Sequence, residues 1–531
     1  MKDCLLIGHN DGNFADHVDL VSSWGTDSVL WRKLNLCFVE VDGVPLNAMD
    51  VINRSNGLDG LRLPKLSNMD VLWPAVSYLA SYLARRGFTV EWVNLFQEEK
   101  SELAAKLRRE DVGAVAVTTT LCLAPWPIQE VVAFVRQHNR SARIVVGGPY
   151  IVNEAATLSP SELAALFVEL GADVYVISQE GELALARVLD AMRHGRPLAD
   201  IDNIAYLENG GFVRTKTSAE SNPLAENPVD YDLFSPERVG DCVLVRTVKS
   251  CPFACSFCSF PVQGGSYVYE DVEAVEAELD RLRRVGTVQA ISFVDDTFNV
   301  PEGRFKQLMR MMIRNAYPFR WSANLRADHL DAESIDLLCR SGCEGVFLGV
   351  ESGSETVLKI MNKSARPEHY RRLIPRLKDA GILTHCSLFI GFPGETRETV
   401  EETAAFLEDL QPDTFQAHPW FCNRATPIWN RREEFGLRGS GFAWEHRTMD
   451  VSTAIEIMEE WFLTVRGPVW LPQQGFSSWS IFYLQRRGMP LAQTMRFMRD
   501  FNDAIRFKLR HGKGQWIEPG LLDAVNASGR F

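Results

Sequence analysis

Short apolar runs alternate with amphipathic stretches of helical period through the first 205 residues of the chain. This alternation is typical of a parallel α/β sheet in which each strand is followed by a covering helix. It predicts a doubly wound, Rossmann-like domain over residues 1–205. The expected strands are residues 4–8, 88–94, 112–118, 143–146 and 173–177, and the expected helices lie around residues 73–86, 101–109, 127–138, 159–170 and 181–193.

An insertion at about residues 9–70 separates the first strand from the first helix of this pattern. It contains Trp24 and Trp31 but shows no clear helical or strand period. Such a segment either covers a ligand or pads the sheet, and the sequence leaves both interpretations open.

The alternation resumes near residue 241, after a turn-rich stretch over residues 206–240 that is predicted to be a linker. Six strand-helix units over residues 241–425 predict a partial (β/α)6 TIM barrel. In such barrels the active residues lie at the carboxyl ends of the strands and in the loops that follow them. The expected strands are residues 243–248, 290–294, 320–325, 345–350, 384–390 and 414–418.

The last region, residues 426–531, is expected to be mostly helical and is rich in tryptophan. These side chains either fill a helical core or form a cap over a substrate. The tryptophans concerned are Trp429, Trp444, Trp461, Trp470 and Trp479. The expected fold class is therefore α/β, with a Rossmann-like domain, a partial TIM barrel and a helical C-terminal cap.

Composition excludes several classes of function. The formal net charge of −13 argues against a nucleic-acid partner, because affinity for a phosphate backbone depends on clustered Lys and Arg. The chain has no apolar run of about 18 residues and begins without the features of a signal peptide. Its eleven cysteines are scattered apart from one triplet, unlike a disulfide framework. We therefore expect a cytoplasmic protein without a membrane segment.

The triplet consists of Cys251, Cys255 and Cys258. Three thiolates with this spacing can hold three irons of a 4Fe-4S cluster and leave the fourth iron open. The alternatives are a chance group of buried cysteines or a zinc loop that lacks its usual second pair of ligands. With Phe257 directly before the last cysteine, the segment resembles the radical S-adenosylmethionine (SAM) superfamily, whose members cleave SAM at such a cluster.

Later strand ends extend this resemblance. Ser322, Asn324 and Arg326 alternate along one strand and therefore share a face, and a guanidinium can form two hydrogen bonds with the SAM carboxylate. Lys363 is either a basic site residue, as in relatives, or a solvated lysine at a helix end. The resemblance implies SAM contacts at Phe257, Asp295, Asp296, Ser322, Asn324, Arg326, Glu351, Gly391 and Pro393.

The strand ends of the expected Rossmann-like domain carry small and hydroxylated residues, at the edge where such sheets bind ligands. Placed directly before a radical SAM core, this domain resembles the cobalamin-binding domain of cobalamin-dependent radical SAM enzymes. Many cobalamin proteins carry Asp-x-His-x-x-Gly after the first strand, but His9 lacks that frame and is not expected on cobalt. The resemblance implies cobalamin contacts at Thr118, Thr119, Thr120, Gly147, Gly148, Pro149, Gln179 and Glu180.

The resemblance implies three cofactors, namely a 4Fe-4S cluster, SAM and cobalamin, together with a flavodoxin- or ferredoxin-type electron donor. The implied reaction uses a 5′-deoxyadenosyl radical and moves a methyl group from methylcobalamin to an unactivated carbon or a phosphinate phosphorus. The expected substrate is a small-molecule or peptide natural product, and several amino-terminal runs are similar to the subgroup containing the phosphinothricin-pathway P-methyltransferases. Arg424 or Arg447 could bind a phosphinate.

Two alternatives to methylation remain open from the sequence. A cobalamin-dependent radical SAM enzyme could instead catalyse a rearrangement, cyclisation or oxidation, with identical motifs for SAM cleavage. A non-catalytic cobalamin sensor with a vestigial cluster is the other alternative. The sequence assigns no catalytic residue beyond the cofactor contacts.

Overall fold

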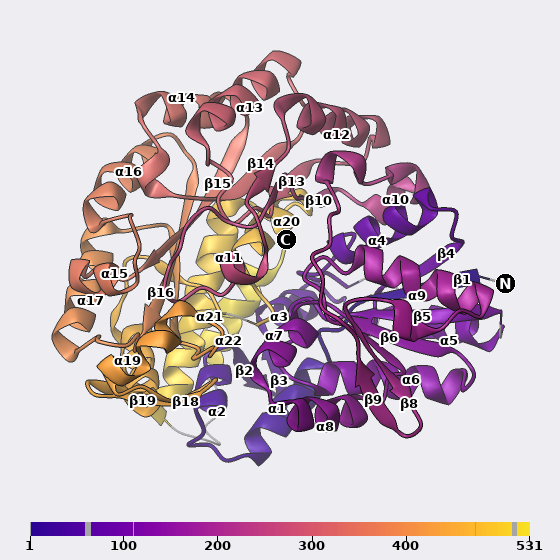
Figure 1. The fold of residues 1–531 in the computed structure, drawn as a ribbon. Helices are drawn as coiled ribbons and strands as arrows, with labels where there is room; N and C mark the ends of the chain where they lie inside the picture. Colours follow the sequence, from indigo (N-terminus) through magenta and orange to yellow (C-terminus); the bar gives the residue numbers. More distant parts are fainter. Residues whose placement is uncertain (1, 59–64, 110, 473, 512–517) are drawn as a thin grey trace.

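The computed structural model describes residues 2–58, 65–109, 111–472, 474–511 and 518–531. Figure 1 shows an amino-terminal α/β domain beside a barrel-like sheet, with the C-terminal helices (yellow) packed against the barrel. Within these ranges, no helix is long and apolar enough to cross a membrane.

The amino-terminal sheet has the strand order β4-β1-β5-β6-β7-β8-β9. Its first five members in this order run parallel, and β1 and β5 are almost continuously buried because helices cover both faces. The predicted Rossmann-like strands are therefore confirmed. They are β1 (Lys2–His9), β4 (Val90–Leu95), β5 (Val112–Thr118), β6 (Arg143–Gly147) and β7 (Val174–Val176), with helices α4 (Pro74–Arg85), α5 (Lys100–Arg108), α6 (Trp126–His138), α7 (Pro149–Thr157), α8 (Pro160–Leu170) and α9 (Glu182–His194).

An antiparallel hairpin of β8 (Ile204–Glu208) and β9 (Gly211–Arg214) extends this sheet beyond β7. Its turn holds Asn209 at φ 50° and Gly210 at φ 82°, the left-handed pair that a two-residue hairpin requires. The predicted linker over residues 206–240 therefore starts too early, since the Asn-Gly pair makes a hairpin within the sheet. The short helix α10 (Pro236–Val239) leads into the barrel.

The insertion after β1 packs against the C-terminal region. Arg32 pairs with Glu459 at 3.0 Å, and Lys508 donates to the carbonyls of Asn35 and Phe38 at 2.8 and 2.7 Å. The insertion therefore joins the amino-terminal domain to the C-terminal region. This role differs from both roles expected from the sequence, covering a ligand or padding the sheet. The elements of the insertion are α1 (Phe14–Ser23), α2 (Val29–Leu34), β2 (Phe38–Val41), β3 (Val44–Asn47) and α3 (Ala48–Ser55).

The second sheet has the parallel order β10-β13-β14-β15-β16-β17-β21 and curves into an open barrel (Figure 1). The six predicted strands are confirmed, and β21 (Val469–Trp470) adds to the last edge from the C-terminal region. The other strands are β10 (Cys242–Val245), β13 (Ala290–Phe293), β14 (Arg320–Leu325), β15 (Cys343–Glu351), β16 (Leu383–Ile390) and β17 (Thr414–Pro419). The covering helices are α12 (Val272–Val285), α13 (Glu302–Asn315), α14 (Ala332–Arg340), α15 (Glu355–Ile360), α16 (Pro367–Asp379) and α17 (Arg397–Leu410), and the first loop holds β11 (Val248–Lys249), α11 (Phe260–Gln263) and β12 (Val268–Tyr269).

The C-terminal region is largely helical, as predicted, but it also contains a small antiparallel sheet. Trp444, Trp461 and Trp470 are no more than 4% exposed, which confirms that these tryptophans fill a core. The elements are α18 (Arg432–Phe435), β18 (Arg438–Ser440), β19 (Ala443–His446), β20 (Met449–Asp450), α19 (Val451–Thr464), α20 (Ser478–Arg486), α21 (Leu491–His511) and α22 (Pro519–Gly529).

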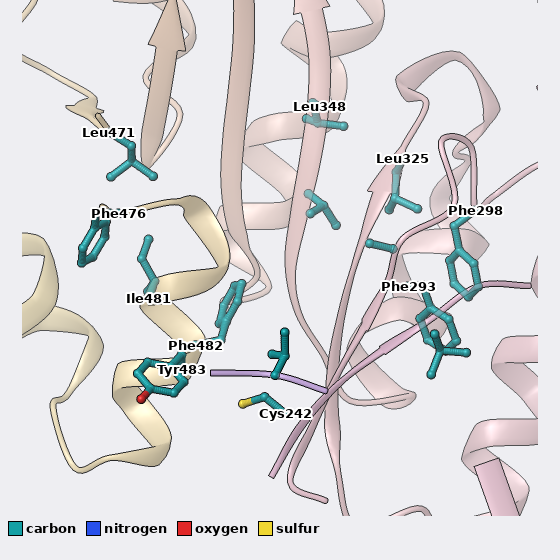
Figure 2. Packing of buried hydrophobic residues seen from close by; sticks show 14 of the residues in the cluster. Cys242, Phe293, Phe298, Leu325, Leu348, Leu471, Phe476, Ile481, Phe482 and Tyr483 are labelled. Atoms are coloured by element: carbon teal, nitrogen blue, oxygen red, sulfur yellow. The ribbon is translucent and has the colours of Figure 1, made fainter. Parts of the chain in front are cut away.

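Helix α20 closes the amino-terminal end of the barrel interior. The ring of Phe482 lies so close to Gly345, near the start of β15, that an added Cβ there would meet it at 2.2 Å. Figure 2 shows Ile481 and Phe482 among the buried side chains of the barrel strands. The C-terminal region therefore closes the barrel at the amino-terminal ends of its strands. The interior is open toward the carboxyl ends of the strands.

Candidate functional site

A cavity of about 440 Å³ lies inside the barrel, toward the carboxyl ends of the strands. Cys251, Cys255 and Cys258 all line it, so the fold brings the predicted triplet to one site. The predicted SAM contacts that also line the cavity are Phe257, Asp296, Asn324, Arg326 and Glu351. Those placed outside its lining are Asp295, Ser322, Gly391 and Pro393.

Backbone hydrogen bonds to two later segments hold the cysteine loop in place. The Ser256 N–H donates to the carbonyl of Met361 at 2.8 Å, and the Ser256 carbonyl accepts from Ile428 at 2.8 Å. Inside the loop, the Cys258 N–H donates to the Cys255 carbonyl at 3.1 Å. Ile428 lies beyond the expected barrel boundary at residue 425, so the C-terminal region contributes to the support of this loop.

The three thiols line one cavity, as the ligands of a cubane cluster would. Burial raises the pKa of the Cys258 thiol to about 11 and also raises the pKa of Cys251, and the neighbouring cysteines add to both shifts. A cubane attaches each thiolate to a different iron, so separated thiols around one cavity fit it. Binding of iron would release the thiol protons.

The adjacent carboxylates Asp295 and Asp296 have different environments. Asp295 is 2% exposed and accepts hydrogen bonds from the Thr247 N–H at 2.7 Å, the Thr247 hydroxyl at 2.6 Å and the Val248 N–H at 2.9 Å. It therefore anchors the segment that leads to the cysteine loop. Asp296 lines the cavity, is exposed to it and is surrounded by protein atoms. Desolvation of its carboxylate, together with the nearby charge of Asp295, raises the pKa of Asp296 to about 6.

Two of the side chains predicted to share a face of β14 lie at different depths. Asn324 lines the cavity and donates to the Asp295 carbonyl at 3.3 Å. Ser322 lies 3.4 Å from the hydroxyl of Ser292 and lines a small hollow beside Phe482, at the closed end of the barrel. The alternation along the strand holds, but the contact predicted for Ser322 lies away from the cavity.

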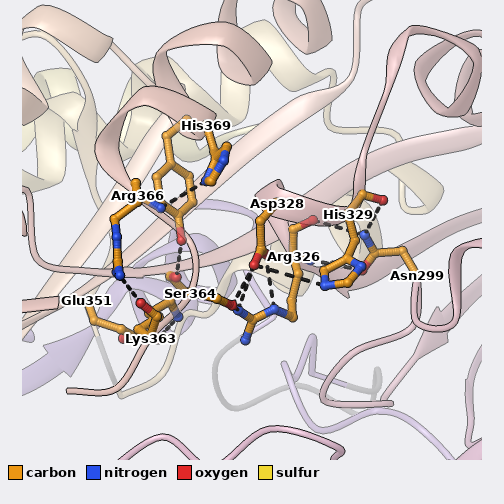
Figure 3. A network of polar contacts seen from close by, with 11 residues as sticks. Asn299, Arg326, Asp328, His329, Glu351, Lys363, Ser364, Arg366 and His369 are labelled. Atoms are coloured by element: carbon orange, nitrogen blue, oxygen red, sulfur yellow. Dashed lines mark hydrogen bonds and ion pairs between the residues drawn. The ribbon is translucent and has the colours of Figure 1, made fainter. Parts of the chain in front are cut away.

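Arg326 is held in a buried polar network, drawn in Figure 3. Its Nε and Nη2 donate to the two carboxylate oxygens of Asp328 at 3.1 and 3.0 Å, and Nη2 also donates to the Ser364 hydroxyl at 2.6 Å. Its guanidinium lies 3.6 Å from the centre of the Phe253 ring in the cysteine loop. The network fixes a positive group beside the cysteines, and the Arg326 guanidinium lowers the pKa of Asp328, against the opposing effect of burial, to about 2.

Glu351 and Lys363 form a second buried charge pair at the cavity, also visible in Figure 3. Nζ of Lys363 lies 3.0 Å from Oε1 of Glu351. Glu351 has φ 65°, a left-handed conformation that is unusual for a glutamate, at the bulge where β15 ends. Lys363 is 7% exposed and lines the cavity, so it is not a solvated lysine at a helix end.

The glycine-proline turn after β16 is tightly built. Gly391 has φ 86°, and its N–H donates to Glu395 at 2.5 Å while its carbonyl contacts His446 at 3.1 Å. An added Cβ at Gly391 would meet the Trp444 ring at 2.3 Å. The turn that contains Gly391 and Pro393 is therefore packed against the small C-terminal sheet.

One polar wall of the cavity was not predicted from the sequence. It consists of His385 and Ser387 on β16 and Gln416 on β17, flanked by Phe347 and Phe389. The ring of Phe257 packs at 5.2 Å from that of Phe389, which connects this wall to the cysteine loop. Alternation along β16 was the available signal, since residues 385, 387 and 389 share a face.

The predicted cobalamin contacts gather at the carboxyl edge of the first sheet. The Thr118 hydroxyl donates to the Gly8 carbonyl, and the Thr119 hydroxyl to the Gly147 carbonyl, both at 3.0 Å. Gly148 has φ 116°, and an added Cβ there would meet the Thr119 hydroxyl at 2.8 Å. Thr120 continues this loop, Pro149 begins α7, and Gln179 and Glu180 follow β7.

Two features of this edge bear on a large flat ligand. Leu121 and Leu123, in the loop after β5, are 61% and 80% exposed, so apolar surface is presented beside the glycine-rich strand ends. His9 is instead buried at 6% exposure and stacks on Trp73 at 4.8 Å. Burial lowers the pKa of His9 to about 4. The edge therefore offers apolar contacts and close backbone approach.

Comparison with known sequences identifies the family. The profile of the radical SAM superfamily matches residues 245–407, the segment that carries the cysteines and the lined cavity. An uncharacterized methyltransferase of Pyrococcus horikoshii is 30% identical over 349 residues, covering 64% of this chain and 74% of the relative. An anaerobic magnesium-protoporphyrin IX monomethyl ester cyclase of Rubrivivax gelatinosus is 26% identical, covering 70% and 68%. The chain belongs to the radical SAM superfamily and is an enzyme of that class.

Solved structures share the arrangement of domains. The radical SAM methyltransferase TsrM from Kitasatospora setae, determined with cobalamin and a 4Fe-4S cluster bound, superposes with a TM-score of 0.58 at 19% identity, over 82% of this chain and 78% of TsrM. The cobalamin-dependent SAM radical enzyme OxsB, determined with aqua-cobalamin bound, gives a TM-score of 0.59 at 15% identity, over 84% and 70%. The fold of this chain is therefore shared with these enzymes.

Proposed function

We propose that the protein is a cobalamin-dependent radical SAM methyltransferase. The main observation is that three cysteines with CxxxCxxC spacing line one barrel cavity together with Arg326 and the buried Glu351–Lys363 pair. The barrel lies beside a Rossmann-like domain whose strand-end edge is glycine-rich. When bound, the cluster, SAM and cobalamin would together supply a substrate radical and a transferable methyl group. The acceptor is an unactivated carbon or a phosphinate phosphorus of a small-molecule or peptide natural product.

The residues of the barrel would bind and orient SAM. Cys251, Cys255 and Cys258 would hold the cluster, and Phe257 lines the same cavity. Arg326 would contact the SAM carboxylate through Nη1, because Nε and Nη2 already donate to Asp328 and Ser364. Asp296, Asn324 and Glu351 offer acceptors for the amino group and the ribose hydroxyls. The remaining predicted contacts, Asp295, Ser322, Gly391 and Pro393, would act from outside the cavity by supporting the cysteine loop, the barrel floor and the turn after β16.

The polar wall would face the substrate. Burial lowers the pKa of His385 to about 4, so this imidazole is neutral near pH 7. His385, Ser387 and Gln416 thus offer uncharged hydrogen-bonding groups, while Arg424 and Arg447 lie outside the cavity lining and donate to the carbonyls of Gly439 and Glu433. This wall favours a neutral acceptor group, so a carbon acceptor suits the cavity better than a phosphinate.

Cobalamin binding at the strand-end edge is supported by the shared fold and by the edge itself. TsrM and OxsB were each determined with cobalamin bound. In this chain, Thr118, Thr119 and Thr120 form the loop after β5, and Gly147, Gly148, Pro149, Gln179 and Glu180 form the loops after β6 and β7. The glycines of these loops allow a corrin ring to approach the backbone closely, and the exposed side chains of Leu121 and Leu123 offer it apolar contacts.

The test is a product analysis with anaerobically reconstituted protein, SAM, hydroxocobalamin and a flavodoxin or ferredoxin as electron donor. The screen would include peptides, carrier-bound acyl groups and phosphinates. A methyltransferase yields a product heavier by one methylene unit, with S-adenosylhomocysteine and 5′-deoxyadenosine formed together. The similarity to a ring cyclase favours a non-methylating reaction as second candidate. An unmethylated product formed with 5′-deoxyadenosine alone would establish that reaction instead.

A further inference from the structure

The hydroxyl of Thr297 is buried at the cavity of the cysteines without a partner. Thr297 lies in the turn after β13, lines the cavity together with Cys251 and is 3% exposed. Among the residues that the structure describes, its Oγ1 has no hydrogen-bond partner. Buried hydroxyls are almost always hydrogen-bonded, so a partner is expected on the cavity side of this one.

The turn that carries Thr297 is held on both sides. Before Thr297, the Asp295 carboxylate accepts from the N–H and the hydroxyl of Thr247 at 2.7 and 2.6 Å, which ties the turn to the segment that leads to the cysteine loop. After Thr297, the Phe298 N–H donates to the Asn324 carbonyl at 3.2 Å. The backbone at Thr297 is therefore fixed relative to the cysteine loop and to β14.

The Thr297 hydroxyl acts on Cys251. Burial raises the pKa of the Cys251 thiol, whereas hydrogen bonding by the backbone of Phe253 and by the Thr297 hydroxyl lowers it, because both favour the thiolate. A thiol sulfur accepts hydrogen bonds only weakly, but a thiolate is charged and accepts them strongly. Cysteine binds iron as the thiolate. The Cys251 sulfur is therefore the partner that Thr297 gains when the metal binds.

We propose that the Thr297 hydroxyl donates a hydrogen bond to the Cys251 sulfur in the cluster-bound protein and thereby raises the reduction potential of the cluster. This role depends on the cluster assignment of the proposed function. Hydrogen bonds to the sulfurs are among the factors that set cluster potentials. Reduction adds one negative charge, and a hydrogen bond strengthens with the charge on its acceptor, so the donor stabilises the reduced form more than the oxidised form. Thr297 is a positioning residue in this scheme, since it acts through Cys251.

The experiment compares Thr297→Val, which keeps the shape of the side chain but removes the hydroxyl, with Thr297→Ser, which keeps the hydroxyl. Each full-length protein is reconstituted with iron and sulfide, and its iron content is measured. Without SAM, samples are poised at fixed potentials with redox mediators, and the reduced cluster is quantified by electron paramagnetic resonance. At the wild-type midpoint, the reduced-to-oxidised ratio should fall about tenfold in Thr297→Val, equal to a shift of about 59 mV for one electron, and should stay unchanged in Thr297→Ser. Thr297→Ala also removes the hydroxyl and should follow Thr297→Val, so it provides the same test if the valine variant binds no cluster.

The matched control is Thr494→Val in α21, the same substitution at another buried threonine, which lies outside the cavity lining. Its midpoint should equal that of the wild type. Wild-type midpoints in cluster-loaded Thr297→Val and Thr297→Ala would overturn the inference, and weaker SAM binding in those variants would then assign the hydroxyl to SAM. An equal fall in Thr297→Ser would also overturn it, since packing rather than the hydroxyl would be the cause. A wild-type protein that assembles no cluster would instead refute the proposed function.

Discussion

Nζ of Lys363 lies 3.0 Å from Oε1 of Glu351, and both side chains are at most 10% exposed. The pair bridges the end of β15 and the segment after α15, on the cavity side that carries the network of Arg326. Neither charge would be stable there alone, because a buried ion without a partner loses its hydration without compensation. The pair therefore couples the stability of the barrel mouth to the geometry of the site.

Lys363→Met should strongly destabilise the protein. It leaves Glu351 buried without its partner, and removing one member of a buried pair costs about 3–5 kcal/mol. The free energy of unfolding, measured with urea, should fall by that order. The double variant Lys363→Met/Glu351→Leu is the control, because it removes both charges and should recover most of the loss. A double variant no more stable than the single one would show that the pairing is not the cause.

Gly349→Ala should weaken SAM binding without unfolding the protein. A Cβ at Gly349 would lie 2.4 Å from Oε1 of Glu351 and 3.4 Å from Nζ of Lys363, so the glutamate has to move. We expect the dissociation constant for SAM to rise about tenfold, which is about 1.4 kcal/mol. Isothermal calorimetry on reconstituted protein measures it.

Gly303→Ala is the matched substitution in α13, where an added Cβ meets no atom within 4 Å among the described residues. It should leave SAM affinity unchanged and alter stability by no more than about 1 kcal/mol. Equal affinities for SAM in the Gly349 and Gly303 variants would place Glu351 outside the SAM site.

Cys258→Ala should abolish the cluster while sparing the amino-terminal domain. Two thiolates cannot replace the three that the cubane requires, so iron content and the brown colour should be lost, together with 5′-deoxyadenosine formation. Cobalamin binding, followed by its visible spectrum, should persist because the strand-end edge is unaltered. Cys339→Ala in α14, outside the cavity lining, should retain cluster and activity. SAM cleavage at the wild-type rate in Cys258→Ala would disprove the cluster assignment.

The fold could be predicted from the sequence where burial alone determines the pattern. The parallel strands of the first sheet were predicted because strands covered on both faces are continuous apolar runs. Those of the barrel, apart from β21, were predicted from the alternation of strands and helices. The hairpin at Asn209 was assigned to a linker, since a turn signal does not reveal whether its flanks pair within an existing sheet. A cluster site could be predicted from the cysteine triplet because the spacing of its ligands is local in sequence and constrained by the chemistry of the cluster.

The rest of the site depends on contacts that no local pattern encodes. Whether Lys363 is solvated or buried is decided by Glu351, which reaches it only after β15 and α15 are packed. Ser387 and Gln416 become neighbours on one wall of the cavity through the register of β16 against β17. The pairing of Glu180 with Lys249 spans 69 residues and two domains. Such pairs follow from tertiary structure, so a single sequence cannot identify them.

Glu395 should make stability depend on pH through the turn that holds Gly391. This carboxylate is 1% exposed, and burial raises its pKa to about 7, against the opposing effect of hydrogen bonds from the N–H groups of Gly391 and Phe392. A raised pKa means that the native state prefers the protonated acid. The contribution of Glu395 to stability is thus fully present below pH 4.5 and is lost as pH rises toward 7, by about 3 kcal/mol in total.

Glu395→Gln removes the ionisation but keeps an oxygen that can accept from Gly391. Relative to wild type, its free energy of unfolding should improve between pH 5 and 7 and level off above pH 7, as measured by urea unfolding at each pH. The exposed Glu401→Gln in the same helix-turn region should show no such trend. A constant difference between Glu395→Gln and wild type across this range would mean that Glu395 titrates as an ordinary glutamate. In that case the turn would gain nothing from a neutral side chain behind Gly391.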